Sequence, residues 1–381
     1  MFALSSKFEK LISYNKHLFL PALIFMVAVI CFLTKQDFES GSLSTLHWGF
    51  YTLSFISVMV LLFFNQDKPL FITASILLSY LLINHLKRSY GYSFTNSEYY
   101  IKLSILLPIN LIIFYFMPNK KLINKQNLYL LFFLLIEVTL VEKLTLPAYL
   151  PYVDYVTMSL FVLMNICSFT QSIRAGTIDS IYLFFAGLCI TVGFYFSDNP
   201  IALALFFFSA ALIIFINICI RIYFFIYKDF LTELSSRQSF VMDSKKFPLK
   251  YSLGIVALDE YENIKKAFGY RYTDDLIRML STIICDFQEK ENVYRYSADE
   301  FVIIFRNETG KEGYEHLEQI RRKVASSEFA LKWRKKPLKI TISASVSEKK
   351  RSDSNAYEVL VRAHKALQKT YKFTQNVTTK I

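Results

Sequence analysis

The sequence has 381 residues, of which 54% are hydrophobic and 19% are charged, and its formal net charge is +12. In soluble domains about a quarter of the residues are charged, so this composition is not that of an ordinary soluble protein. The deficit lies in the first part: residues before Lys228 include 14 Lys+Arg and 10 Asp+Glu, against 29 and 21 from Lys228 onward. Cytoplasmic loops and a surface facing anionic lipids account for the basic excess, so we expect membrane lipids and no nucleic acid as partners.

Eight apolar runs dominate the first part of the chain. Each has about 20 residues, enough for a helix to cross the hydrocarbon core of a bilayer. We therefore predict an N-terminal all-α transmembrane bundle of about eight helices over residues 1–220, and a second domain over 221–381 that begins with a connecting helix over 221–246. The apolar runs cover residues 17–34, 46–64, 69–86, 100–117, 126–146, 152–170, 178–197 and 200–226.

Loop charges predict the orientation of these spans. With eight spans, basic residues are somewhat more frequent on the side that holds both termini, which places both termini in the cytoplasm. Glu137 lies in the middle of the fifth run, and a carboxylate inside a membrane is a candidate functional residue. An interhelical hydrogen bond is the other explanation for Glu137. The charges on the side of the termini are Lys7, Lys10, Lys16, Lys68, Lys120, Lys121, Lys125 and Arg174, and those on the other side are Lys35, Lys87, Arg88, Lys102 and Lys143.

The hydrophobic period changes after Tyr251. Strands and amphipathic helices alternate from there on, which predicts an α+β domain with a central, mostly antiparallel sheet. Two short strands on either side of Ser297-Ala298-Asp299 have the pattern of a hairpin. The predicted strands cover 251–259, 292–296, 300–306 and 338–346, and the predicted helices cover 272–289, 312–325 and 355–371.

Four motifs in this half resemble the GGDEF family of diguanylate cyclases. KDFLTELSSRQSF over 228–240 is similar to the DxLTgLxNRrxF opening of the family. YRYSADEF over 294–301 stands where the family has RYGGDEF, and Thr341–Val346 resembles a later family strand. Between the first two motifs, a further stretch keeps the family spacing at Asp259, Glu260, Tyr261, Ile264, Phe268, Gly269 and Asp274.

The resemblance implies a reaction and a set of site residues. Family members join two GTP molecules into cyclic di-GMP across a homodimer, and Mg²⁺ is the cofactor of this phosphoryl chemistry. Asp299 and Glu300 match the metal-binding and catalytic acidic positions. Asp274 matches a guanine-contacting carboxylate, and Lys265 replaces a guanine-contacting Asn. The family has another metal-binding Asp, on the strand that corresponds to 251–259, and this position is Ala257 here. Asp299 has therefore lost its partner as a metal ligand.

Other departures from the family pattern surround the acidic pair. They remove glycines from the hairpin and positive charge from the phosphate contacts, at Ser297, Ala298, Glu262, Tyr371 and Gln375. We therefore predict a degenerate, non-catalytic domain in the cytoplasmic (inner) membrane of a bacterium, acting through dimerisation, a protein partner or guanine-nucleotide sensing. The alternative is an active diguanylate cyclase. A third reading is a transporter or sensor whose soluble domain is vestigial.

Overall fold

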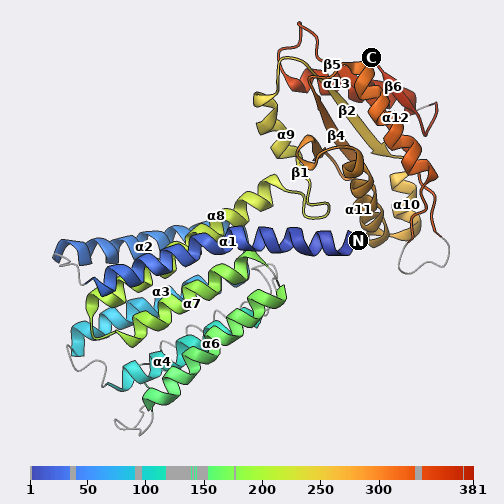
Figure 1. Ribbon diagram of the computed structural model, residues 1–381. Helices are drawn as coiled ribbons and strands as arrows, with labels where there is room; N and C mark the ends of the chain where they lie inside the picture. The colour runs from blue at the N-terminus through green and yellow to red at the C-terminus, as the bar shows by residue number, and fades with distance from the viewer. Residues whose placement is uncertain are drawn as a thin grey trace. The chain divides into compact units, whose positions relative to one another are not determined.

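The computed structural model describes residues 2–34, 40–90, 97–116, 153–175, 177–330, 337–371 and 373–381, together with Thr139, Val141 and Lys143. The chain divides into two compact units, Met1–Arg221 and Ile222–Ile381. Figure 1 shows that the first unit consists of long helices and that the second contains a sheet flanked by helices.

The first unit is entirely helical in its described part. Six of its helices are long and apolar enough to cross a membrane, because each contains an uninterrupted stretch of at least 18 mostly apolar residues. The described helices are α1 (Phe2–Leu33), α2 (Ser40–Phe63), α3 (Asp67–Tyr90), α4 (Glu98–Phe116), α6 (Val153–Ala175), α7 (Ile178–Tyr195) and α8 (Pro200–Tyr227), of which α2, α3, α4, α6, α7 and α8 are the candidate spans.

The predicted number of eight spans is therefore only partly supported. The first predicted run lies in α1, whose described apolar part, Leu18–Leu33, is shorter than the six candidate spans. The fifth predicted run, 126–146, lies almost wholly outside the described residues, and so does Glu137. Lys102, which the orientation argument counted among loop charges, lies inside α4 and is buried against Glu98, with 3.5 Å between Nζ and Oε1.

Helix α8 is fixed within the first unit by polar contacts near its end. The guanidinium of Arg221 donates hydrogen bonds to the carboxylate of Asp179 on α7 and, over 2.8 Å, to the side-chain oxygen of Gln66. An ionic side chain among apolar helices is stable only when such partners are present. The contacts therefore hold this part of α8 at one register against its neighbours.

The connecting helix predicted over 221–246 is not continuous, because only 221–227, in α8, and 237–243, in α9, are α-helical. Helix α8 ends at Tyr227, and a turn follows in which the Asp229 carboxylate accepts hydrogen bonds from Thr232. The chain then forms β1 and the short helix α9 (Arg237–Asp243), which Ser236 caps through its hydroxyl. Asp and Ser side chains that bond to nearby backbone amides favour turns and helix starts over a continuous helix.

The second unit contains a six-stranded mixed sheet. The strand order is β1-β3-β4-β2-β5-β6, with the inner four strands antiparallel and the two edge strands parallel to their neighbours. The strands are β1 (Ser235–Ser236), β2 (Tyr251–Leu258), β3 (Val293–Arg295), β4 (Glu300–Arg306), β5 (Ile342–Glu348) and β6 (Thr378–Lys380), and the helices after α9 are α10 (Tyr261–Phe268), α11 (Tyr270–Phe287), α12 (Gly310–Ser326) and α13 (Ala356–Tyr371).

The two faces of the sheet pack into two separate hydrophobic cores. Alternate residues of β2 point to opposite faces, so Val256 and Leu258 meet α11 and α12, whereas Leu253 and Ile255 meet α9 and α13. Both layers of helices are visible in Figure 1. This packing brings the end of β2, the start of β4 and helix α13 to one place.

Candidate functional site

A cavity of about 560 Å³ opens where β2 ends and β4 begins, within the usual size of a small-molecule site. Its lining comes from the end of β2 and the loop and helix that follow, from the acidic residues of the β3–β4 hairpin, and from α13 and the segment after it. The lining residues are Ala257, Leu258, Glu260, Tyr261, Glu262, Asn263, Asp299, Glu300, His364, Leu367, Gln368, Tyr371 and Gln375.

Ala257 and Glu300 are directly opposite each other in the antiparallel pair of β2 and β4. Directly opposed side chains lie about 5 Å apart at Cβ, so a carboxylate at 257 would stand beside that of Glu300. The methyl group of Ala257 leaves Glu300 without this partner. Instead, Nε2 of His364 on α13 lies 2.9 Å from Oε1 of Glu300. The Glu300 carboxylate is thus engaged by an imidazole of the chain itself.

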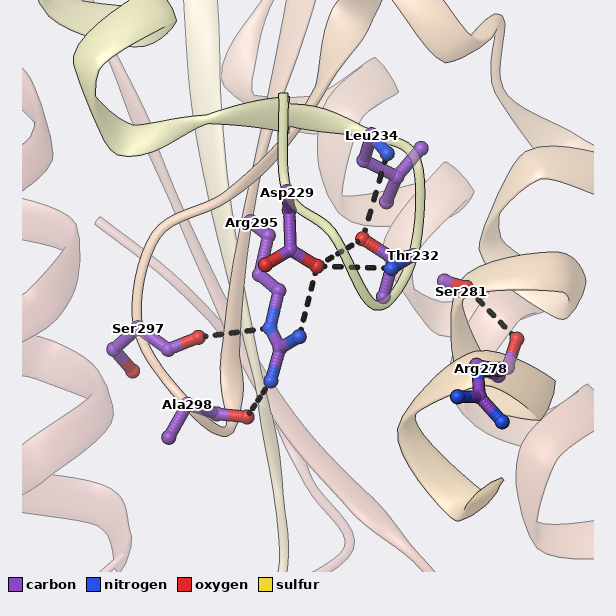
Figure 2. A network of polar contacts seen from close by, with 8 residues as sticks. All are labelled: Asp229, Thr232, Leu234, Arg278, Ser281, Arg295, Ser297 and Ala298. Carbon is purple, nitrogen blue, oxygen red and sulfur yellow. Dashed lines mark hydrogen bonds and ion pairs between the residues drawn. The ribbon is translucent and has the colours of Figure 1, made fainter. Parts of the chain in front are cut away.

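The hairpin that carries Asp299 is stabilised by Arg295, as Figure 2 shows. The guanidinium donates to the backbone oxygens of Ser297 and Ala298 over 3.3 and 2.9 Å, and to the Asp229 carboxylate over 2.8 Å. Neither Ser297 nor Ala298 has a positive φ, so their side chains cause no backbone strain in this turn. The Asp299 carboxylate accepts a 3.0 Å hydrogen bond from the Ser297 hydroxyl.

Asp229 links this hairpin to the turn after α8. Its Oδ1 atom accepts from the Arg295 guanidinium and from both the amide and the hydroxyl of Thr232. Burial acts to raise the pKa of Asp229, but the hydrogen bonds from Arg295 and Thr232 outweigh it, so the pKa lies below its usual value. The opening motif of the domain is therefore a structural support of the hairpin.

Asp259 has a structural role next to the cavity. It is 3% exposed, and it accepts hydrogen bonds from the hydroxyls of Thr341 and Ser343 over 2.6 and 2.7 Å and from the amide of Asn376 over 2.9 Å. These three donors use its lone pairs and tie the end of β2 to β5 and to the segment before β6. Asp259 is therefore not available as a substitute for a carboxylate at Ala257.

Tyr371 closes one end of the cavity. Its hydroxyl accepts a 2.9 Å hydrogen bond from the backbone N–H of Glu260. Glu260 has a left-handed φ of 56° and is the N-cap of α10, and its own side chain makes no capping hydrogen bond. An amide at a helix start is the kind of donor that binds phosphate, and here a side chain of α13 takes it.

The predicted base-contacting residues do not line the cavity. Lys265 on α10 pairs with Glu262 over 3.1 Å, and its ammonium lies 4.9 Å from the ring centroid of Tyr270. Asp274 lies on α11. Both side chains act electrostatically on Tyr261, whose pKa is raised mainly by burial. Lys265 acts to lower the pKa of this phenol, and Asp299 and Asp274 act to raise it. The structure thus brings Asp299 and Glu300 together with Ala257 at the cavity, and leaves Lys265 and Asp274 outside its lining.

The residues present do not fit a Mg²⁺ site. Mg²⁺ needs near-octahedral oxygen ligands at about 2.1 Å and is usually held by one or two carboxylates plus waters and phosphates. Ala257 supplies no oxygen from its side chain, His364 engages Glu300, and Ser297 engages Asp299. Among the described residues that line the cavity there is no Lys or Arg to receive phosphate charge.

Sequence reasoning missed His364. No motif marks a single histidine on a helix, and its partner Glu300 lies 64 residues earlier in the chain. The available signal was spacing, because positions 364, 367, 368 and 371 recur at the three- and four-residue steps of one helix face. Because Tyr371 corresponds to a site position of the family, His364, which lies two turns earlier on the same helix face, was also a candidate.

Comparisons with known proteins concern the C-terminal part of the chain. Residues 226–376 match the family model described as "Diguanylate cyclase, GGDEF domain". A search of curated proteins found no match to this chain.

Three solved structures show similarity to the chain. They are the FimX GGDEF domain from Pseudomonas aeruginosa (20% identity, 41% of this chain and 99% of that chain, TM-score 0.37), the GGDEF domain of DgcB from Caulobacter crescentus in complex with c-di-GMP (24%, 40% and 92%, 0.37), and the active GGEEF domain of a diguanylate cyclase from Vibrio cholerae (20%, 37% and 89%, 0.33).

Proposed function

We propose that this chain, whose residues 226–376 match the family model of the diguanylate cyclase GGDEF domain, is a membrane-anchored signalling protein of the bacterial cyclic di-GMP system that does not itself make cyclic di-GMP. It acts as a homodimer, through a protein partner or through binding of a guanine nucleotide such as GTP. The observation that carries this proposal is the environment of Glu300. The opposite position holds Ala257, and His364 occupies the Glu300 carboxylate.

The loss of transition-state contacts makes turnover by this site slow. Phosphoryl transfer depends on positioning and on neutralisation of the charge that develops on the phosphate oxygens. Each missing charge contact costs about 10²-fold or more in rate. A metal carboxylate is missing at Ala257, and positive charge is missing at Tyr371 and Gln375. Together these losses are larger than the retained acidic pair can compensate.

The retained pair supports one rival function. Asp299 and Glu300 both line the cavity, as they would in an active diguanylate cyclase that converts two GTP molecules to cyclic di-GMP and pyrophosphate. In that case Glu300 and Asp299 would act with Mg²⁺, and Asp274 would read the guanine. Lys265 would then contact the guanine in place of the Asn that the family has at this position.

A cellular experiment separates the two functions. The full chain and its Glu300→Gln variant are produced at equal levels in a bacterium that carries a fluorescent cyclic di-GMP reporter. We expect identical reporter output from both, because the proposed function uses no chemistry at Glu300. A signal that rises with the natural chain and falls to background with Glu300→Gln would establish the rival function.

The membrane location is part of the proposal. Six described helices are long enough to span a bilayer, and the apolar part of α1 and the run over 126–146 would bring the number to eight. An even number of spans places both termini on the same side of the inner membrane, and the excess of Lys and Arg in the loops on that side makes it the cytoplasmic side, together with the C-terminal domain. The basic loops then face the anionic lipids of the cytoplasmic leaflet.

A further inference from the structure

One face of α13 forms a wall of the cavity. His364, Leu367, Gln368 and Tyr371 follow one another at the three- and four-residue steps that place side chains on one side of a helix, and all four line the cavity. The two outer residues of this face each contact a polar group of another element: His364 contacts Glu300 on β4, and Tyr371 contacts the amide of Glu260. The two inner residues, Leu367 and Gln368, line the cavity between them.

The first contact involves the lone pairs of Glu300. With 2.9 Å between Nε2 of His364 and Oε1 of Glu300, the imidazole stands where a cation bound to this carboxylate would stand. The two side chains are mostly buried, at 36% and 18% exposure, so water competes only partly for the contact. A metal ion that binds this oxygen, or both oxygens of the carboxylate, would therefore have to displace His364.

The second contact removes an amide donor. The amide of Glu260 would face an anion at the start of α10, where the N-terminus of a helix favours negative charge. The hydroxyl of Tyr371 accepts the hydrogen bond from this amide instead. A phosphate group would therefore have to break this contact.

From these two contacts we propose that His364 and Tyr371 are internal ligands of the cavity, which keep it closed to a metal-bound triphosphate. The proposal rests on the proposed non-catalytic function and names the residues that determine what the same site accepts. The proposal predicts that one substitution does not restore a metal site. Replacing Ala257 by Asp supplies the missing carboxylate, but metal binding stays weak as long as His364 contacts Glu300.

Metal binding tests the part played by His364. The full chain is prepared in lipid nanodiscs, and free Mn²⁺ is measured by electron paramagnetic resonance for Ala257→Asp alone and combined with His364→Leu, His364→Gln or His316→Leu. We expect His364→Leu to tighten Mn²⁺ binding of Ala257→Asp at least about tenfold, because binding strength follows the number of available charged ligands. His364→Gln keeps a donor for Glu300 and should leave the affinity within about twofold of Ala257→Asp.

His316 provides the matched control. It lies on α12, stacked on the ring of Phe305, and does not line the cavity. Its replacement should leave Mn²⁺ binding unchanged. Equal Mn²⁺ affinity of Ala257→Asp with and without His364→Leu would overturn the proposed role of His364.

Hydrogen exchange tests the part played by Tyr371 without any change at position 257. In the natural chain, Tyr371→Phe should speed exchange of the Glu260 amide about fivefold, the value of one ordinary hydrogen bond. The matched control is Tyr357→Phe, an exposed tyrosine at the start of the same helix. An unchanged exchange rate in Tyr371→Phe would contradict the contact.

Binding of a nucleotide tests the contacts of His364 and Tyr371 together. A fluorescent GTP analogue with Mn²⁺ should bind Ala257→Asp/His364→Leu about fivefold more tightly when Tyr371→Phe is added, and no more tightly when Tyr357→Phe is added. Equal or weaker binding after Tyr371→Phe would refute closure by Tyr371. If the natural chain binds the analogue tightly but forms no cyclic di-GMP, the internal-ligand proposal fails and the proposed function stands.

Discussion

At the scale of single residues, the acidic pair and its surroundings point to different functions. Asp299 and Glu300 were predicted from sequence as site residues, and both line the cavity. The partners that engage them, Ser297 and His364, were not predicted. A motif fixes which residue occupies a position, but the hydrogen bonds of that residue depend on side chains that folding brings from distant parts of the chain.

Asp229 provides a prediction of pH dependence. Its pKa lies below the usual value in the folded state, so its stabilising contribution is present above the unfolded value of about 3.9. The contribution is lost as the pH falls through the lower folded value. Asp229→Asn should therefore lower stability at pH 7 by about 1–3 kcal/mol and have a smaller effect as the pH approaches the folded value. Calorimetry in nanodiscs across pH 3–7 measures this; an equal effect at every pH would contradict it.

Asp259 provides a prediction about structure alone. Its carboxylate accepts three hydrogen bonds while buried, so Asp259→Ala should leave the three donors unpaired and destabilise the domain by about 3–5 kcal/mol. Domain unfolding measured by hydrogen exchange checks the loss. An unchanged unfolding free energy would show that water replaces the carboxylate in this position.

At the scale of elements, the longer strands and helices of the second unit were predicted well. The strand predicted over 300–306 is β4, and that over 251–259 is β2 to within one residue. The short edge strands β1 and β6 and the helix α10 were missed, and α9 is a short piece of the longer helix predicted over 221–246. Elements of two to eight residues contain too few periods for a pattern, and parallel edge strands form only when a distant partner is in place.

The close approach of α12 to the sheet gives an element-scale prediction. A Cβ added at Gly313 would lie 2.8 Å from the Ser252 hydroxyl and 3.0 Å from the Phe305 ring, both on strands of the sheet. Gly313→Ala gains about 1 kcal/mol of helix propensity but must push the helix away, for a net loss of about 1–2 kcal/mol. The control is Gly310→Ala in the same helix, whose Cβ meets no atom closer than 3.4 Å.

Thermal unfolding of the two variants in nanodiscs measures the difference. Gly313→Ala should unfold several degrees below the natural chain, and Gly310→Ala should unfold at the same temperature as the natural chain or a few degrees above it, because it gains helix propensity without a clash. The same melting temperature for both variants would show that α12 shifts at no cost.

For the whole molecule, the apolar helices of the first unit were predicted from the length of the apolar runs alone. Length predicts that a helix can span, and six of the eight predicted runs are described as such helices. The contacts inside the bundle were not predicted. Arg221 and Asp179 look like charges near the ends of spans in the sequence, and only the packed helices show that they pair.

The side of the membrane on which the C-terminus lies can be tested with fusion proteins. Both termini in the cytoplasm follow from the eight-span proposal and from the bias of loop charge. Green fluorescent protein fused after Ile381 should fluoresce, and alkaline phosphatase fused at the same place should be inactive. Active phosphatase after Ile381 would mean an odd number of spans or the reverse orientation.

Turnover of GTP is measured as the cyclic di-GMP that the chain of residues 1–381 forms in nanodiscs. The reaction is run with Mg²⁺ and with Mn²⁺ at a protein density that favours dimers, and product is quantified by mass spectrometry. We expect no more product from the natural chain than from its Glu300→Gln variant, because the proposed function uses no chemistry at Glu300. Repeated turnover by the natural chain that Glu300→Gln abolishes would contradict it.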